Sequence, residues 1–209
     1  MQEYKASRKI RDREVLVVVG QQGFGKTVYS KKTVETRKRS LIFDPTGGFD
    51  GLTPDDPDEM IEYVGGHEMF RVRMTNQLNL PVLYALANGV GNCTVVIDEA
   101  QRIVPAGKHE IDLGLLDLIY RGRHPESGPV DLIIIAQRPT TIHIAIRSQW
   151  TRLISFRQTE PADIAWMEQT SGVTFEGIRD FQVFDYYEVR QGQPILKKHL
   201  SPVGRLAVD

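Results

Sequence analysis

Short apolar runs alternate along the chain with longer stretches in which apolar and polar residues are mixed. The most apolar runs cover residues 15–19, 41–43, 94–97 and 132–135. Short β-branched runs of this kind are typical of buried strands in a parallel sheet. The mixed stretches that are compatible with helices cover residues 26–38, 58–64, 81–87 and 111–120. This alternation predicts an α/β fold, with right-handed crossovers and helices on both faces of a mostly parallel sheet.

Two further segments carry a different pattern. Residues 69–74 alternate between apolar and basic positions, which predicts a half-buried strand. Near the end of the chain, two strand-like runs at 181–189 and 194–199 flank a turn at Gln191-Gly192. We therefore expect an antiparallel β-hairpin within residues 181–200, added to the end of the sheet.

Composition narrows the class of protein. The 26 Lys and Arg residues against 27 Asp and Glu give a net charge of -1, which excludes a histone-like coat for nucleic acid. Cys93 is the single cysteine, so no intramolecular disulfide forms and a reducing compartment fits. No apolar run approaches the roughly 20 residues of a membrane helix, and no signal peptide is visible. We expect a soluble intracellular protein with one domain over residues 1–209, including a basic segment at 1–13.

The first predicted strand leads directly into the pattern GxxxxGK[ST]. Its glycines let the backbone curl so that N–H groups point at phosphate oxygens. The lysine, Lys26, would neutralise the β and γ phosphates, and the Thr27 hydroxyl would bind Mg²⁺ at the positive end of the next helix. Because a buried strand precedes it and a helix follows, we interpret the motif as a nucleotide site rather than a Gly-rich turn. The residues assigned to nucleotide binding are Gly20, Gln21, Gln22, Gly23, Phe24, Gly25, Lys26, Thr27 and Val28.

Two carboxylates follow the apolar run at 94–97. By itself, an acidic residue at a strand end normally caps the next helix or solvates the sheet edge. Beside a phosphate-binding loop, Asp98 is placed to hold the Mg²⁺ shell, and Glu99 can orient and polarise the attacking water. The second carboxylate favours hydrolysis, since a small-molecule kinase keeps water out. We take Glu99 as the catalytic base.

The apolar run at 132–135 ends in Ala136 and Gln137. In an α/β sheet, ligands bind beyond the carboxyl ends of the strands, so Gln137 is expected at the same edge as Asp98. An amide there could bond both the γ phosphate and the attacking water. A strand-end glutamine on its own is more often an ordinary loop residue, and the coincidence with the other strand ends favours a catalytic role.

Arginines near the end of the helical stretch 111–120 form another candidate group. Arginines at a helix end can simply complement the helix dipole. Phosphoryl transfer in ring ATPases also needs an arginine on the transition-state charge, often supplied by a neighbouring subunit. Arg123 is the first candidate for this trans-acting finger, with Arg121 and Arg147 behind it.

Together these residues resemble the FtsK–HerA superfamily of ring-forming DNA translocases, from residue 15 to about residue 169. Beyond the nucleotide motifs, the specific matches are Phe43-Asp44-Pro45-Thr46-Gly47, Gly122-Arg123, Ala136-Gln137-Arg138-Pro139, Ser155-Phe156-Arg157 and Glu160-Pro161-Ala162-Asp163. The resemblance implies a RecA-like (ASCE-type) P-loop NTPase core with an extra strand between the P-loop strand and the strand before Asp98. It also implies a homo-oligomer, a ring of six subunits with ATP at the interfaces and double-stranded DNA in the hole.

Departures from the family guide the choice of a member. The barrel of cellular HerA proteins, the membrane segments of septal FtsK proteins and a DNA-reading winged helix are all missing. What remains resembles the genome-packaging ATPases of membrane-containing icosahedral viruses. We therefore expect an ATP- and Mg²⁺-dependent motor that drives double-stranded DNA into a preformed capsid. It would reside in the host cytoplasm or the virion and dock to a capsid vertex or membrane protein. Gly48 departs from the acidic residue expected there in HerA proteins.

DNA contacts are harder to place. Candidates are Lys108 and His109 in the loop at 105–109, and the basic cluster from Lys5 to Arg13. For each of them, a solvated charged surface is at least as good an interpretation. A motor that grips the backbone would bind without sequence preference.

Other functions stay open at this point. Within the superfamily, a filamentous-phage assembly ATPase or a cellular HerA-type translocase without its barrel remains an alternative. From other classes, a small P-loop nucleotide or metabolite kinase and a non-hydrolysing, nucleotide-gated binding module are alternatives, although no part of the hydrolytic machinery is disabled. The sequence does not indicate a preference for ATP over GTP. Trp150 and Trp166 could mark a subunit contact, but core positions are expected.

Overall fold

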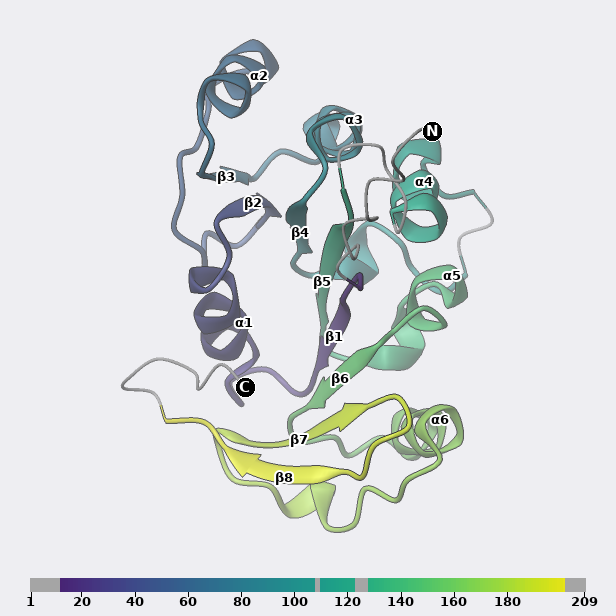
Figure 1. Ribbon diagram of the computed structural model, residues 1–209. Coiled ribbons are helices and arrows are strands. Elements are labelled where there is room, and N and C mark those ends of the chain that lie inside the picture. Colours follow the sequence, from purple (N-terminus) through teal and green to yellow (C-terminus); the bar gives the residue numbers. More distant parts are fainter. Residues whose placement is uncertain (1–11, 108–109, 123–127, 202–209) are drawn as a thin grey trace, which may run out of the picture.

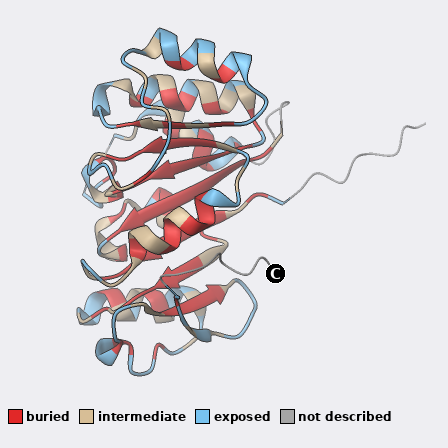
Figure 2. Ribbon diagram, turned by 90° about the vertical axis from the view of Figure 1, so that its left-hand side faces the viewer, coloured by how far each residue is buried: buried red, intermediate tan, exposed pale blue. Residues whose placement is uncertain are grey.

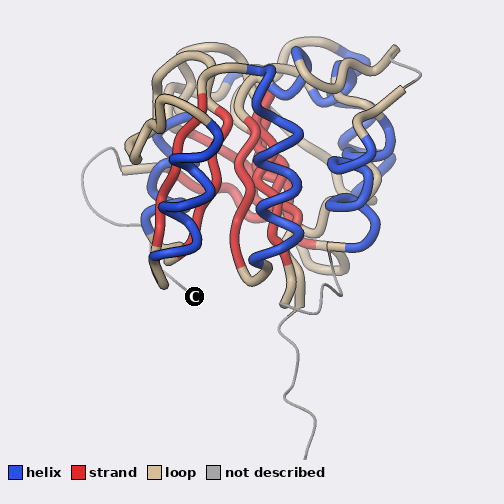
Figure 3. Tube along the Cα trace, turned by 90° about the horizontal axis from the view of Figure 1, so that it is seen from above, coloured by secondary structure: helices blue, strands red, loops and turns tan. Residues whose placement is uncertain are grey.

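The computed structural model describes residues 12–107, 110–122 and 128–201 of the chain (Figure 1). One sheet of eight strands, in the order β3-β2-β4-β5-β1-β6-β7-β8, runs through it. Its strands are β1 (Val15–Val19), β2 (Arg39–Phe43), β3 (Phe70–Met74), β4 (Cys93–Ile97), β5 (Val130–Ala136), β6 (Arg152–Ser155), β7 (Asp185–Arg190) and β8 (Leu196–His199). The strands lie side by side, and helices flank them (Figure 3).

The helices connect these strands. They are α1 (Lys26–Glu35), α2 (Pro57–Gly66), α3 (Leu80–Val90), α4 (Leu113–Arg121), α5 (Ile144–Arg147) and α6 (Pro161–Ser171). Short 3₁₀ turns lie at η1 (Gln77–Asn79), η2 (Ala100–Arg102), η3 (Pro139–Thr141) and η4 (Ile178–Asp180). The strands and helices predicted from the apolar pattern are present, with ends that shift by a few residues.

The sheet has the predicted topology. The strands from β3 to β6 in this order are parallel, and β7 and β8 are added antiparallel to β6 and to each other. β5 lies between β1 and β4, so the extra strand between the P-loop strand and the Asp98 strand is confirmed. The RecA-like α/β fold with a C-terminal hairpin is therefore confirmed.

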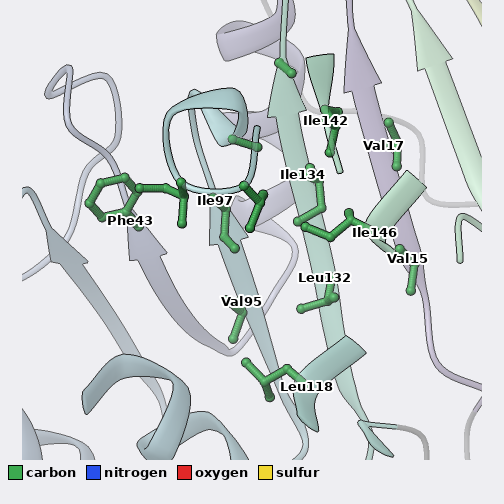
Figure 4. Packing of buried hydrophobic residues seen from close by; sticks show 14 of the residues in the cluster. Val15, Val17, Phe43, Val95, Ile97, Leu118, Leu132, Ile134, Ile142 and Ile146 are labelled. Carbon is green, nitrogen blue, oxygen red and sulfur yellow. The ribbon is translucent and has the colours of Figure 1, made fainter. Parts of the chain in front are cut away.

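Alternate residues of each central strand face opposite sides of the sheet. Val15, Val17 and Val19 point into a larger apolar cluster together with residues of α2 to α6, whereas Leu16 and Val18 point into a smaller cluster beside α1. Figure 4 shows the larger cluster, where Leu118 of α4 packs near β4 and β5. The strands are buried from both sides (Figure 2), which explains why they are continuously apolar in sequence.

β3 and the hairpin differ from these central strands. Phe70, Val72 and Met74 are buried while the two arginines between them are partly exposed, so the half-buried strand is confirmed. The hairpin strand β7 begins at Asp185, later than the predicted 181, because the 3₁₀ turn η4 runs up to Asp180 and Phe181 is packed in the larger cluster.

The apolar pattern did not predict β6 and α6. β6 is only four residues long and begins with Arg152, whose charge is balanced by Glu14 and Glu188. α6 has just Ile164, Trp166 and Met167 as large apolar side chains. Both elements depend on tertiary contacts rather than on a periodic local pattern.

Two expectations about single residues have clear outcomes. Trp150 is buried in the larger cluster and Trp166 packs partly against it, as expected for core residues. Arg13 was a candidate for a DNA contact, with a solvated surface as the alternative, and the structure fits neither, because the side chain is buried. Its buried guanidinium donates to the carbonyl oxygens of Val130 and Ile119, both at 2.7 Å, and to that of Leu118. The rest of that cluster, Lys5 to Arg11, lies outside the described residues.

Candidate nucleotide-binding site

The loop between β1 and α1 has the conformation that the glycine motif predicts. Gly20, Gly23 and Gly25 have φ angles of 147°, 83° and 114°, which side-chain-bearing residues rarely adopt. A Cβ atom at Gly20 would also lie 2.5 Å from the Cβ of Phe156. The carbonyl of Gly25 accepts the N–H of Tyr29 at 2.9 Å, so the first turn of α1 follows the loop directly. The loop therefore leads directly into a helix N-terminus, where N–H groups are suited to bind phosphate.

Lys26 begins α1 and folds back over the loop. Its Nζ atom donates to the carbonyl oxygens of Gly20 at 2.7 Å and Gln21 at 2.9 Å. Burial lowers the pKa of the ammonium, and the negative charges of Glu99 and Asp98 act in the opposite direction. The charges of Lys26, Asp98 and Glu99 therefore interact, as expected if the loop lies beside the end of β4.

Asp98 and Glu99 follow β4 and diverge from each other. Asp98 is 4% exposed and its Oδ1 atom accepts the N–H of Glu99 at 2.9 Å. Burial raises the pKa of Asp98 to about 6, and the charge of Glu99 adds to the increase. Glu99 has left-handed backbone angles (φ 50°, ψ 45°), and its carboxylate accepts a hydrogen bond from the Gln101 amide. This backbone conformation is uncommon for a residue other than glycine, and the two adjacent carboxylates have different hydrogen-bond partners.

The loop after β2 completes one side of the site and was only partly foreseen. Buried Asp44 accepts the N–H groups of Thr46 at 3.1 Å, Gly47 at 2.9 Å and Phe49 at 2.7 Å. Burial acts to raise the pKa of Asp44, but these hydrogen bonds outweigh it and hold the pKa below its usual range. Asp44 therefore stays charged and shapes the loop.

This loop brings two groups to the site that sequence reasoning did not assign. The Thr46 hydroxyl lies 3.4 Å from Oδ2 of Asp98, and a Cβ atom at Gly48 would lie 3.0 Å from Cγ2 of Thr27. The absence of the expected acidic side chain at Gly48 thus leaves Thr27 its space. The adjacency of β2 and β4 in the sheet could have indicated these contacts. Neighbouring parallel strands end at the same edge, so the loop after β2 lies beside Asp98.

Gln137 follows β5 and touches the phosphate loop through its backbone. Its carbonyl accepts the N–H of Gly20 at 3.2 Å and the side-chain amide of Gln158 at 3.0 Å. The Gln137 side chain is exposed. The predicted meeting of the β1, β4 and β5 ends is therefore confirmed in position.

The segment after β6 also surrounds the phosphate loop. Gln21 donates its N–H to the carbonyl of Arg157 at 3.0 Å and its side-chain amide to the Thr159 hydroxyl at 2.8 Å. The Arg157 guanidinium lies 5.3 Å from the centre of the Phe24 ring. These contacts were missed, since only the match of Ser155-Phe156-Arg157 to a family pattern pointed there.

The hairpin reaches the loop through Phe184. Its N–H donates to the carbonyl of Phe24 at 3.1 Å, and its carbonyl accepts the N–H of Leu200 at 2.8 Å. Phe184 has a φ of 74°, an uncommon value for a large residue. The start of β7 and the end of β8 are thereby fastened to the phosphate loop.

Of the predicted arginines, Arg121 and Arg147 make their contacts elsewhere in the chain. Arg121 ends α4, forms an exposed ion pair with Asp117 at 3.7 Å, and precedes Gly122, whose carbonyl accepts the N–H of Val130. Arg121 therefore lies where β5 begins, about 20 Å from the end of this seven-residue strand. Arg147 lies over the Trp166 ring at 5.6 Å. Arg123, Lys108 and His109 lie outside the described residues.

The polar groups fit a magnesium–nucleotide complex better than a metal held by protein alone. The Thr27 hydroxyl and the Asp98 carboxylate are hard oxygen donors, of the kind that Mg²⁺ prefers. No group of three or more His, Cys, Asp or Glu side chains in residues 12–107, 110–122 and 128–201 could hold a metal ion. Few protein ligands are expected for Mg²⁺, which is usually completed by phosphates and water.

Comparisons with known proteins give structural neighbours. No protein-family model and no curated protein sequence matches the chain. The genome packaging NTPase B204 from Sulfolobus turreted icosahedral virus 2, in complex with sulfate, matches with a TM-score of 0.73 and 16% identity, over 94% of this chain and 100% of that chain. The chain shares its fold with this packaging NTPase.

Other solved structures agree with this fold. The DNA-packaging ATPase B204 from Sulfolobus turreted icosahedral virus matches with a TM-score of 0.67 and 16% identity, over 91% of this chain and all of that chain. VirB4 of Thermoanaerobacter pseudethanolicus matches with a TM-score of 0.60 and 10% identity, over 90% and 89% of the two chains.

Across the described residues, the helices are too short or too polar to cross a bilayer.

Proposed function

We propose that this chain is a Mg²⁺-dependent ATPase that pumps double-stranded viral DNA into a preformed capsid. The observation that carries the proposal is the meeting of Lys26, Asp98, Glu99 and Gln137 around a glycine loop with phosphate-binding geometry. The shared fold with viral packaging ATPases supports the choice of DNA as the cargo. We treat residues 1–209 as one ATPase domain.

Each group has a role in hydrolysis. Backbone N–H groups of Gly20 to Val28 would hold the phosphates, and Lys26 would move its ammonium from the loop carbonyls to the β and γ phosphates. Thr27 and Asp98 would hold Mg²⁺, which when bound neutralises charge on the phosphates. Glu99 would orient the attacking water and accept its proton, and the Gln137 amide would bond the γ phosphate and that water.

An arginine from a neighbouring subunit would complete the site. The distance between Arg121 and the end of β5 supports action in trans, because the side chain cannot reach its own phosphate loop. Arg123 is our first candidate, followed by Arg121 and Arg147. The proposed assembly is a homo-oligomeric ring, hexameric by its resemblance to the FtsK–HerA superfamily, so hydrolysis would take place at subunit interfaces.

The ring would hold DNA without reading its sequence. Lys108 and His109 are the proposed contacts in its pore, and a capsid vertex or membrane protein is the proposed docking partner. The motor would act in the host cytoplasm or remain in the virion. Binding through phosphate contacts should weaken steeply as salt rises.

Phosphate release from ATP and Mg²⁺, with and without linear double-stranded DNA, tests the proposal across a range of protein concentrations. A motor with a trans arginine should turn over more steeply than in proportion to protein, and DNA should stimulate it. Turnover proportional to protein and indifferent to DNA would contradict the motor and leave a nucleotide hydrolase. A phosphorylated small product in place of free phosphate would indicate a kinase.

Mixed assemblies test the trans arginine. An Arg123→Ala chain keeps its own Asp98, and an Asp98→Ala chain keeps its own Arg123, so mixing them should restore part of the turnover that each lacks alone. Parallel mixtures with Arg121→Ala and Arg147→Ala distinguish the candidates. If no mixture regains turnover, a finger supplied in trans is excluded.

A further inference from the structure

Aromatic and guanidinium groups gather on the side of the phosphate loop that faces β6 and β7. Phe24 comes from the loop itself, Arg157 follows β6, and Phe184 precedes β7. Phe24 and Phe184 are partly buried against the smaller apolar cluster, and Phe156 lies beneath them in that cluster. The proposed hydrolytic roles do not use any of these side chains.

The phosphate loop fixes the direction in which a nucleotide would leave it. The groups suited to the γ phosphate, Asp98 and Glu99, follow β4, on the other side of β1 and β5 from β6. In such loops, the lysine reaches the β and γ phosphates, while N–H groups of the loop and of the helix N-terminus cradle the α and β phosphates. Val28, in the first turn of α1, packs against the same apolar cluster as Phe24 and Phe184. A nucleoside attached to the α phosphate therefore points toward β6 and β7.

The groups that it would meet there are flat and partly open to solvent. The Arg157 guanidinium lies 5.3 Å from the Phe24 ring centre, and its Nε atom is buried with no hydrogen-bond partner among the described residues. The guanidinium lies over one face of the ring, and such a stacked pair attracts another π system through stacking and cation–π contact. Stacking uses the face of a base, which all bases share, rather than the edge that distinguishes adenine from guanine.

The hairpin sets the position of Phe24. The Phe24 carbonyl is held by the Phe184 N–H at 3.1 Å, and a Cβ atom at Gly25 would lie 2.8 Å from Cδ1 of the Phe184 ring. Gly25 thus gives the ring of Phe184 room against the loop. Phe184 is a positioning residue in this arrangement, because it acts through Phe24.

We propose that Phe24 and Arg157 form the nucleoside-binding platform of the site, on which a purine base stacks with little discrimination between adenine and guanine. The proposal rests on the proposed nucleotide function and adds the chemistry of base recognition to it. Two other roles for the pair have different consequences. Arg157 could instead bind a phosphate, or the pair could serve only to brace the loop.

Equilibrium binding of Mg²⁺ complexes of ADP, GDP and tripolyphosphate separates these roles without requiring turnover. Titration calorimetry would compare the parent chain with Phe24→Leu, which keeps an apolar side chain, and with Arg157→Gln. Arg179→Gln, at an exposed position in η4, is the matched control. Thermal melts verify that each variant is folded. If Arg157→Gln does not fold, Phe24→Leu alone tests the proposal.

For the parent chain, ADP and GDP should bind within about fivefold of each other, because stacking is tolerant of base identity. Both platform variants should bind each nucleotide about tenfold more weakly, the loss that corresponds to one stacking contact. Tripolyphosphate, which has no base, should bind all chains alike, and Arg179→Gln should match the parent.

Three results would overturn the platform. An equal loss for tripolyphosphate in Arg157→Gln would assign the guanidinium to phosphate, and unchanged nucleotide binding in both variants would leave a purely structural brace. A preference of more than about fiftyfold for one purine would contradict readout by stacking. If the parent chain binds neither nucleotide nor tripolyphosphate, the proposed function fails as well, which distinguishes that failure from failure of the platform alone.

Discussion

Charged groups differ in their partners between the two edges of the parallel sheet, the one where the strands begin and the one where they end. At the edge where the strands begin, Arg13 is bound by backbone carbonyls, and Arg37 forms ion pairs with Glu14 and with Asp131 at 3.5 Å. At the edge where the strands end, the Lys26 ammonium lies on loop carbonyls, and the N–H of the sequence neighbour Glu99 and the Thr46 hydroxyl are the hydrogen-bond partners of buried Asp98 among the described residues. Charges at the first edge are paired within the protein, whereas at the second edge Lys26 and Asp98 have no oppositely charged partner within ion-pair distance among the described residues, although Arg138 and Asp163 pair there at 2.7 Å.

Positive φ angles occur at both edges. Those of Gly20, Gly25, Glu99 and Phe184 lie where the parallel strands end, and those of Asn92 and Gly128 lie where β4 and β5 begin. Strained conformations and unpaired charges cost folding free energy, and they persist where binding or catalysis needs them. The comparison therefore predicts that substitutions at the two edges separate activity from stability.

The largest effect is expected for Glu99→Gln. Replacing the proposed base by an isosteric amide should lower phosphate release by about 10³-fold, while nucleotide binding and the melting temperature stay near the parent values. The matched control is Glu14→Gln at the opposite edge, where the carboxylate pairs with Arg37 and with Arg152 at 3.4 Å. Glu14→Gln should lose stability and keep its turnover when assayed well below its melting temperature. A Glu99→Gln chain that hydrolyses ATP at the parent rate would remove Glu99 from the mechanism.

The largest loss of stability is expected for Arg13→Ala. Removing the guanidinium leaves the carbonyls of Leu118, Ile119 and Val130 without this buried donor, and the cost should be about 3 kcal/mol. Urea titration would measure the free energy of unfolding. Arg13→Lys should recover part of it, because an ammonium can still donate to some of these oxygens. Equal stability of Arg13→Ala and the parent would show that water replaces the guanidinium without cost.

A smaller effect is expected for Asp98, and it depends on pH. The pKa in the folded chain is about 6, above the value of 3.8 for a free aspartate, so the folded state binds more protons between these values. The carboxylate therefore costs stability above pH 6, and the cost disappears as the pH falls toward 4. Asp98→Asn should be more stable than the parent at pH 8, by about 1–3 kcal/mol, and should lose this advantage near pH 4. Urea titrations at both pH values measure this, and an advantage that persists at pH 4 would contradict the assignment.

The smallest effect is expected for Gly48→Ala. The added methyl group would lie 3.0 Å from Cγ2 of Thr27, so the threonine must shift slightly. The Mg²⁺ concentration for half-maximal turnover should rise a few-fold with little change in melting temperature. Gly65→Ala, where a Cβ atom meets no atom within 4 Å, is the control. An unchanged Mg²⁺ requirement would show that Thr27 has room to adjust.

The sequence predicts most of this fold because its central strands are buried on both faces. Runs such as 15–19 and 132–135 are apolar without interruption, and the glycine motif marks the turn between the first strand and the first helix. β6 escaped notice because its first residue, Arg152, is charged and is balanced by residues far away in sequence. No local pattern encodes such long-range pairing.

The sequence likewise places some residues of the candidate site and not others. Residues that directly follow apolar runs, such as Asp98 and Gln137, could be placed at one edge from the strand pattern alone. Thr46 and Arg157 could not, because Thr46 depends on the turn that Asp44 organises and Arg157 depends on β6 lying beside β1. The burial of Arg13 could not be predicted either, because no local pattern in its basic segment indicates the three carbonyl oxygens to which it donates.

The outermost strands determine how copies of this chain can meet. On one side, residue Leu52 accepts the N–H of Arg73 at 2.7 Å and donates to the carbonyl of Arg71 at 2.9 Å, so hydrogen-bonding groups of β3 are already used. On the other side, β8 has only four residues and carries Lys197 and Lys198. Short, lysine-bearing or covered edges resist the addition of a further strand. Addition of a strand from a second copy is therefore disfavoured at both sides of the sheet, and we expect copies of this chain to meet through helices and loops instead.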